Sequence, residues 1–169
     1  MYISTDAIIL KNTAYKESSI ISRLFTYDHG KVSVIFKGAK KSKKKISAII
    51  EPANIINITY YNNNSNIKNV KEVNLKKIYH NTRKVLDNYY CIMAIIALLD
   101  KVCQENHPEK EIFNLLLRVL DDINTQKASV DIIFLYFLFQ LSKTLGFQLT
   151  LSNSSSNLYN PIHIFNQSK

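Results

Sequence analysis

The chain is poor in the residues that build many active sites: its 169 residues include three glycines, three prolines, two cysteines and no tryptophan. Three separated glycines cannot form the glycine-rich loop that cradles nucleotide phosphates. Cys91 and Cys103 are twelve residues apart in a helical pattern, or roughly 18 Å along a helix, which is too far for a disulfide. The histidines have no ligand-like spacing, so we predict no zinc site and no other metal site.

Clustered catalytic groups are also missing. The first half contains five isolated acidic residues, from which a two-metal nuclease site can be drawn although nothing in their spacing requires one: Asp6, Glu17, Asp28, Glu51 and Glu72. No nucleophile with a neighbouring base can be assembled either. We therefore expect a protein that is not an enzyme and needs no cofactor.

No apolar run approaches the roughly 20 residues that span a bilayer. The longest run, residues 132–139, lies between Asp131 and Gln140 and predicts a buried helix. The first residues have neither the basic region nor the apolar core of a secretory signal. These absences predict a cytoplasmic protein with no membrane partner.

Positive charge is abundant, and it is concentrated in one half. Residues 1–80 contain 14 Lys/Arg and 5 Asp/Glu, whereas residues 81–169 contain 8 of each, so the net charge of +9 belongs to the first half. Six lysines occupy residues 37–45, and no acidic residue lies between Asp28 and Glu51. Such a cluster indicates binding to a polyanion, most commonly nucleic acid; the alternative is a solvated surface loop. The predicted phosphate contacts are Lys37, Lys40, Lys41, Lys43, Lys44, Lys45, Arg23, Lys11, Lys16 and Lys31.

The first half has the pattern of short strands. Five runs rich in β-branched and aromatic residues are separated by polar turns, at residues 7–12, 19–27, 31–37, 53–61 and 67–75. In the third run, alternation places Val32, Val34 and Phe36 inside and leaves a partly cationic open face with Lys31. The pattern predicts an OB-fold β-barrel whose open face and loops bind single strands; an SH3-like barrel fits it as well. Tyr15, Tyr27 and Tyr61 lie nearest the polar turns and are the predicted base-stacking residues.

The second half has helical periodicity. A wide apolar surface over residues 82–104 predicts a central, mostly buried helix. A second helix is expected from His107 with Pro108 at its first position, and a third from a Ser129 cap to Leu145, followed by a left-handed Gly146. The expected fold class is α+β: an OB domain at 1–79, a helical domain at 80–150, and a polar, disordered tail at 151–169.

Several fragments in the first half resemble one family when taken together. They are TDAIIL at 5–10, YKES at 15–18, FTYDHGKV at 25–32, KGAKK at 37–41 and EP at 51–52, with LGF at 145–147 in the second half. In this order and at these intervals they resemble the RecO family of recombinational DNA repair proteins. The resemblance implies an OB fold followed by a helical domain. By position, Lys37, Lys40 and Lys41 correspond to the family's basic motif; Lys43, Lys44 and Lys45 extend it by charge alone.

The resemblance also implies an activity and partners. Similar proteins bind single- and double-stranded DNA, anneal complementary strands and contact the C-terminal tail of the single-stranded-DNA-binding protein. With RecR, and indirectly RecF and RecA, they assist the loading of RecA. Many members carry a four-cysteine zinc site after the LGF motif, but this chain has no cysteine after Cys103. We therefore expect the zinc module to be absent. A general RNA- or single-strand-binding OB protein, and a product that folds but no longer works, stay as alternatives.

Overall fold

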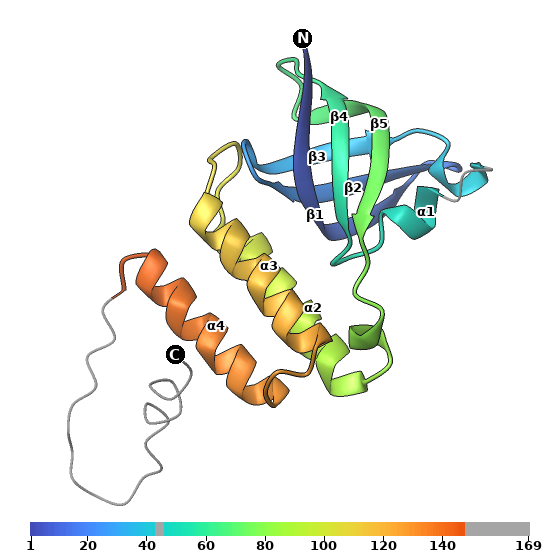
Figure 1. The fold of residues 1–169 in the computed structure, drawn as a ribbon. Coiled ribbons are helices and arrows are strands. Elements are labelled where there is room, and N and C mark those ends of the chain that lie inside the picture. The colour runs from blue at the N-terminus through green and yellow to red at the C-terminus, as the bar shows by residue number, and fades with distance from the viewer. Residues whose placement is uncertain (43–45, 148–169) are drawn as a thin grey trace, which may run out of the picture.

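The computed structural model describes residues 1–42 and 46–147 and contains a β-barrel followed by helices (Figure 1). The barrel strands are β1 (Tyr2–Tyr15), β2 (Ser19–Thr26), β3 (Gly30–Phe36), β4 (Ile55–Tyr61) and β5 (Ile67–Lys77). They close in the order β1-β2-β3-β5-β4, with β3 and β5 parallel and the other pairs antiparallel. Two short helices, η1 (Ala39–Lys41) and α1 (Ile46–Ile49), connect β3 to β4. This closed five-stranded topology is that of an OB fold and confirms the predicted fold class.

The alternation of the sequence explains the barrel interior. Val32, Val34 and Phe36 of β3 are buried inside, as predicted, together with Leu24 of β2 and Ile58 of β4. The hairpin from β2 to β3 turns at Gly30, whose φ of 64° lies in the left-handed region that glycine adopts readily. The main change from the predicted strands is in β1, which extends to both sides of residues 7–12.

The helical part consists of η2 (Asn81–Arg83), α2 (Leu86–Val102), α3 (Lys110–Asn124) and α4 (Val130–Thr144). The prediction that the first long helix is the central one is wrong. α3 has seven buried residues and α2 has five, because one side of α2 leaves Leu86, Tyr89 and Tyr90 exposed. The third helix is confirmed, with Ser129 at its N-cap and Gly146 at a φ of 83° after its end.

The predicted start of the second long helix is also wrong. α3 begins at Lys110 with Glu109 at its N-cap, so Pro108 lies outside the helix. The preceding residues pair with the barrel instead: the backbone N–H of Asn106 donates to the carbonyl of Lys31, 3.1 Å away. Glu109 has φ −129° and ψ 72°, outside the helical region, so the helix cannot start before Lys110.

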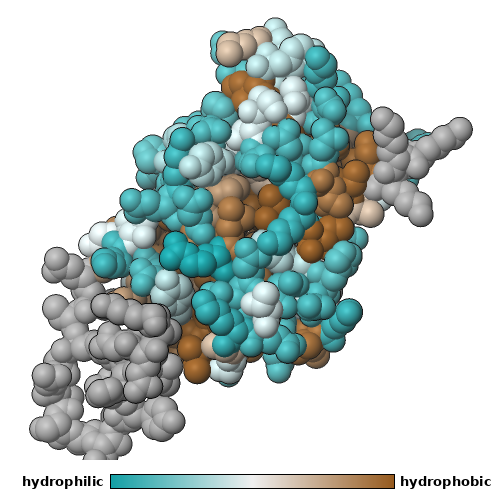
Figure 2. Space-filling model, viewed as in Figure 1, coloured by the Kyte–Doolittle hydropathy of each residue, from teal (hydrophilic) through white to brown (hydrophobic). Residues whose placement is uncertain are grey.

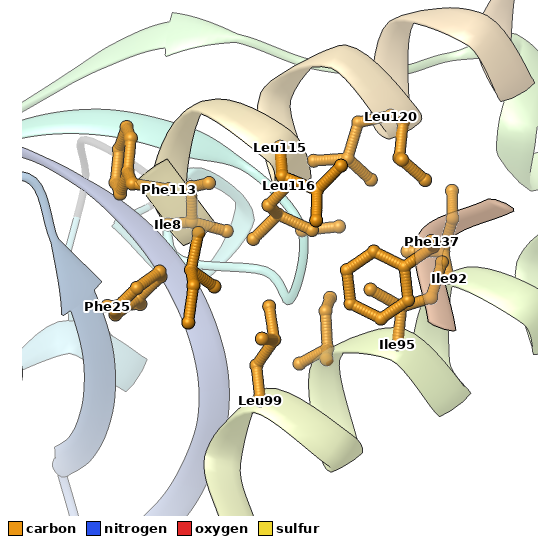
Figure 3. Close-up of a cluster of buried hydrophobic side chains, with 14 of the residues drawn as sticks. Ile8, Phe25, Ile92, Ile95, Leu99, Phe113, Leu115, Leu116, Leu120 and Phe137 are labelled. Atoms are coloured by element: carbon orange, nitrogen blue, oxygen red, sulfur yellow. The ribbon is translucent and has the colours of Figure 1, made fainter. Parts of the chain in front are cut away.

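Barrel and helices share one hydrophobic core. Ile8 and Phe25, on the outer face of the barrel, pack with Leu99 of α2 and Leu116 of α3, and Figure 3 shows these side chains pointing toward one another. The predicted domain boundary, between residues 79 and 80, falls between the end of β5 and the start of η2. Apolar packing nevertheless continues across it, so the helices hold a fixed position on the barrel.

Much of the face seen in Figure 2 is hydrophilic, with hydrophobic side chains gathered in the middle of the view, where barrel and helices meet. In the described part of the chain, no helix is long and apolar enough to cross a membrane. The tail predicted at 151–169 lies outside the described residues.

Candidate nucleic-acid interface

Four lysines from separate parts of the barrel lie at one end of it: Lys16, Lys37, Lys40 and Lys41, here called the lysine cluster. The contact that joins them is between η1 and the turn from β1 to β2. The backbone N–H of Lys40 donates to the carbonyl of Ser18 (3.0 Å), and its ammonium donates to the carbonyl of Lys16 (3.2 Å). All four side chains are exposed. Figure 1 shows η1 and α1 on the side of the barrel away from the long helices.

Two asparagines hold the segment after the lysine run. The side-chain amide of Asn12 donates to the carbonyl of Ile50 (2.7 Å), and that of Asn54 donates to the carbonyls of Ala48 (3.1 Å) and Ile49 (2.9 Å) at the end of α1. Asn54 is fully buried. These hydrogen bonds anchor the backbone of residues 48–50, between the lysine run and β4, to the barrel. Sequence reasoning missed both residues, because asparagine is common throughout the chain and neither one belongs to a motif.

The lysine cluster has no ion-pair partner among the described residues, although Glu17 adjoins Lys16 in the chain. Within residues 1–42 and 46–147, no acidic side chain forms an ion pair with any of its four members. Other lysines do have carboxylate partners: Lys76 with Asp6, Lys77 with Asp121, Lys110 with Asp28 and Lys127 with Asp122. Unpaired like charges repel one another, so this end of the barrel is stabilised by an arriving polyanion.

Some predicted phosphate contacts lie elsewhere. Lys43, Lys44 and Lys45 lie outside the described residues and stay predictions. Lys11 is exposed on β1 but lies opposite Arg23 in the β1–β2 ladder, roughly 17 Å along the strand from Lys16. It is therefore a separate cation and not a member of the lysine cluster.

Arg23 and Lys31 face the helices and have partners in α2, and their predicted phosphate contacts stay predictions. One guanidinium nitrogen of Arg23 lies 2.8 and 3.0 Å from the two carboxylate oxygens of Asp100 in α2. Lys31 is 8% exposed, and its ammonium donates to the carbonyl of Asp100 at 2.7 Å. The predicted open face of β3 is thus covered by α2 at Lys31, whereas Ser33 and Ile35 are partly exposed and Lys37 is exposed. Both residues hold the helices against the barrel through Asp100 of α2.

Replacing Lys31 with methionine is expected to destabilise the fold by about 1–3 kcal/mol, because it leaves the partly buried carbonyl of Asp100 without its donor. Urea denaturation measures this loss. Lys41→Met, which also removes one charge, is the matched control and should leave stability unchanged while weakening DNA binding. The structural role assigned to Lys31 is contradicted if Lys31→Met is as stable as wild type and loses as much DNA affinity as Lys41→Met.

The predicted stacking tyrosines lie at three separate places. Tyr15 is next to the lysine cluster, with the ammonium of Lys16 5.4 Å from its ring centroid. Tyr61 pairs with Tyr2 at the opposite end of β1. Tyr27 packs on Phe113 of α3, with ring centroids 5.4 Å apart. The structure therefore brings only Tyr15 to the lysines.

The described residues contain no group of three or more His, Cys, Asp or Glu side chains that could hold a metal ion. Both cysteines are free. Burial raises the pKa of Cys103 to about 12, helped by Glu109, and burial together with Asp131 raises the pKa of Cys91 to about 11. Both are neutral thiols at physiological pH, so neither is an activated nucleophile.

These features define an OB-barrel protein with a fused helical bundle and a cationic barrel end. The chain belongs to the RecO family of DNA repair proteins. Its residues 1–79 match the family model for the N-terminal part of recombination protein O, and residues 83–157 match the model for the C-terminal part.

Relatives described as DNA repair protein RecO match most of this chain. The protein of Salinibacter ruber is 29% identical over 145 residues, which cover 85% of this chain and 56% of the relative. That of Chlorobium limicola is 26% identical over 152 residues (89% and 58%), and that of Alkaliphilus metalliredigens is 25% identical over 156 residues (92% and 63%). The chain thus spans little more than half the length of the first two relatives.

Proposed function

We propose that this protein binds single- and double-stranded DNA through the lysine cluster and anneals complementary strands. The observation that carries the proposal is the lysine cluster itself: exposed cations that form no ion pair with the described carboxylates, on anchored backbone, at one end of a RecO-family OB barrel. Phosphates neutralise these cations and release counterions, which favours association. Lys43, Lys44 and Lys45 follow Lys41 closely in the sequence and add three positive charges to the same run.

Annealing requires two backbones to approach while their bases stay free to pair. Lysines at the barrel end screen the repulsion between the two phosphate chains, and contacts to phosphates alone carry no sequence preference. The protein then acts without turnover, as a scaffold for pairing, in the cytoplasm where DNA is repaired. Two of the five acidic residues in the first half, Asp6 and Asp28, form ion pairs with lysines. This fits a role that needs no catalytic carboxylate.

The family also supports a role as recombination mediator. We include in the proposal contacts with RecR and with the tail of the single-stranded-DNA-binding protein, and through them assistance to RecF and RecA. The alternative, a general RNA- or single-strand-binding OB protein, is supported by charge alone, whereas the family matches favour DNA repair.

The test is annealing of two complementary DNA strands, first bare and then coated with single-stranded-DNA-binding protein. Wild-type protein should accelerate both reactions, and a variant with alanine at all four positions of the lysine cluster should accelerate neither. If the wild-type protein accelerates annealing of bare strands only, the mediator role is refuted and the proposed annealing activity stands. No acceleration of either substrate by wild-type protein would refute the proposed function.

A further inference from the structure

The outer face of β2 and β3 is covered by the helices at its hairpin end. Many OB barrels hold a single strand against this face, where aromatic side chains stack on the bases. Here Phe25 of β2 packs on Phe113 of α3, with ring centroids 5.6 Å apart, and Lys31 of β3 donates to a carbonyl of α2. Both of these side chains are buried, whereas Ile21, Arg23, Ser33 and Ile35 on the same face are partly exposed. Phe25 is the one aromatic residue on this face of β2 and β3, so the face presents no accessible ring on which a base could stack while the helices stay docked.

The loop from α2 to α3 fixes this cover. Lys31 exchanges two backbone hydrogen bonds with it: its N–H donates to the carbonyl of Gln104 (3.4 Å), and its carbonyl accepts from Asn106 (3.1 Å). At Gly30 the loop approaches so closely that a β carbon there would lie 2.1 Å from the carbonyl oxygen of His107. The cover is therefore tightly packed backbone, continuous with the shared core.

The lysine cluster offers few aromatic rings for base stacking in place of that face. Of the predicted stacking residues only Tyr15 lies beside it, and one ammonium already lies over the Tyr15 ring. Tyr27 is engaged by Phe113 and by the ammonium of Lys110, 4.7 Å from its centroid. Stacking of successive bases needs several accessible rings in a row, and the described residues provide no such row beside the lysines.

We infer that this protein recognises the sugar–phosphate backbone alone, and that a strand without bases is as good a ligand for the lysine cluster as a strand with them. The inference rests on the proposed function, since it specifies how the same site holds DNA. Backbone recognition leaves every base of the bound strand exposed to solvent and ready to pair. It also predicts equal affinity for strands of different sequence.

The test compares two fluorescent strands of equal length and charge, a thymidine oligomer and an oligomer of abasic sugar phosphates. Each has about 20 nucleotides, more than the roughly 4–16 that one OB barrel covers. Full-length protein should bind both with dissociation constants within about twofold, and with the same slope against salt. Tyr15→Leu, which keeps an apolar side chain but removes the ring, should bind thymidine strands as tightly as wild type.

Tighter binding of the thymidine strand by about fivefold or more, the contribution of a single stacked base, would overturn the inference while leaving DNA binding intact. A similar loss of thymidine affinity in Tyr15→Leu would do the same and would identify the stacking ring. Failure to bind either strand would instead refute the proposed function, and the inference with it.

Discussion

Alanine at all four positions of the lysine cluster is expected to lower the affinity for single-stranded DNA at least about tenfold at physiological salt. Each phosphate contact contributes roughly 0.7 to the slope of log affinity against log salt, so the slope should become shallower by about 2 to 3. Fluorescence anisotropy at several salt concentrations measures both quantities. Stability should fall little, because the four side chains are exposed, form no ion pair with the described acids and lose one exposed hydrogen bond, from Lys40 to the carbonyl of Lys16.

The matched control removes the same charge from the other lysines, those with carboxylate partners. It carries alanine at Lys76, Lys77, Lys110 and Lys127. Both variants have the same net charge, so a difference between their DNA affinities shows that the positions of the lysines matter. Equal weakening by the two variants would show that DNA responds to overall charge, and the lysine cluster would lose its assigned role.

Gly30→Ala is expected to have the largest effect on stability of any single change considered, a loss of at least about 3 kcal/mol. The new β carbon would lie 2.1 to 2.6 Å from three backbone atoms of His107, which cannot move without shifting the loop that covers β3. The residue would also carry a positive φ of 64°. Urea denaturation measures the loss.

Gly38→Ala separates the cost of the clash with His107 from the cost of the positive φ. Gly38 has a φ of 69°, almost that of Gly30, but its added β carbon would meet no atom within 4 Å. This variant should lose only the roughly 1–2 kcal/mol of a left-handed alanine. Equal losses of stability in the two variants would mean that the loop from α2 to α3 moves easily to make room for the β carbon. The helices would then not be a rigid cover of the barrel.

The barrel was predictable because its signals are local. Alternation in residues 31–37, the turn at Gly30 and the fragments shared with the RecO family all lie in short stretches of sequence. The lysine run was recognisable for a local reason too, because its six lysines follow one another closely with no acidic residue between Asp28 and Glu51 in the sequence; that the run binds DNA stays a prediction.

The cover was not predictable, because it depends on contacts between distant residues. Arg23 and Asp100 are 77 positions apart, and no local pattern distinguishes a cation that pairs across the fold from one that awaits a phosphate. Lys31 looked like part of an open face because strand alternation reports which side a residue occupies, not what packs on that side. The start of α3 depends on the same docking, because the loop before it bonds to Lys31 and α3 begins only after Pro108.

The central claim is that DNA contacts the lysine cluster, and lysine footprinting tests it most directly. Full-length wild-type protein is acetylated briefly with and without saturating DNA, and modification at each lysine is read by mass spectrometry. The account predicts strong protection of Lys16, Lys37, Lys40 and Lys41, with Lys76 and Lys127 modified equally in both samples. Protection of Lys76 and Lys127 while the lysine cluster stays reactive on bound DNA would contradict it.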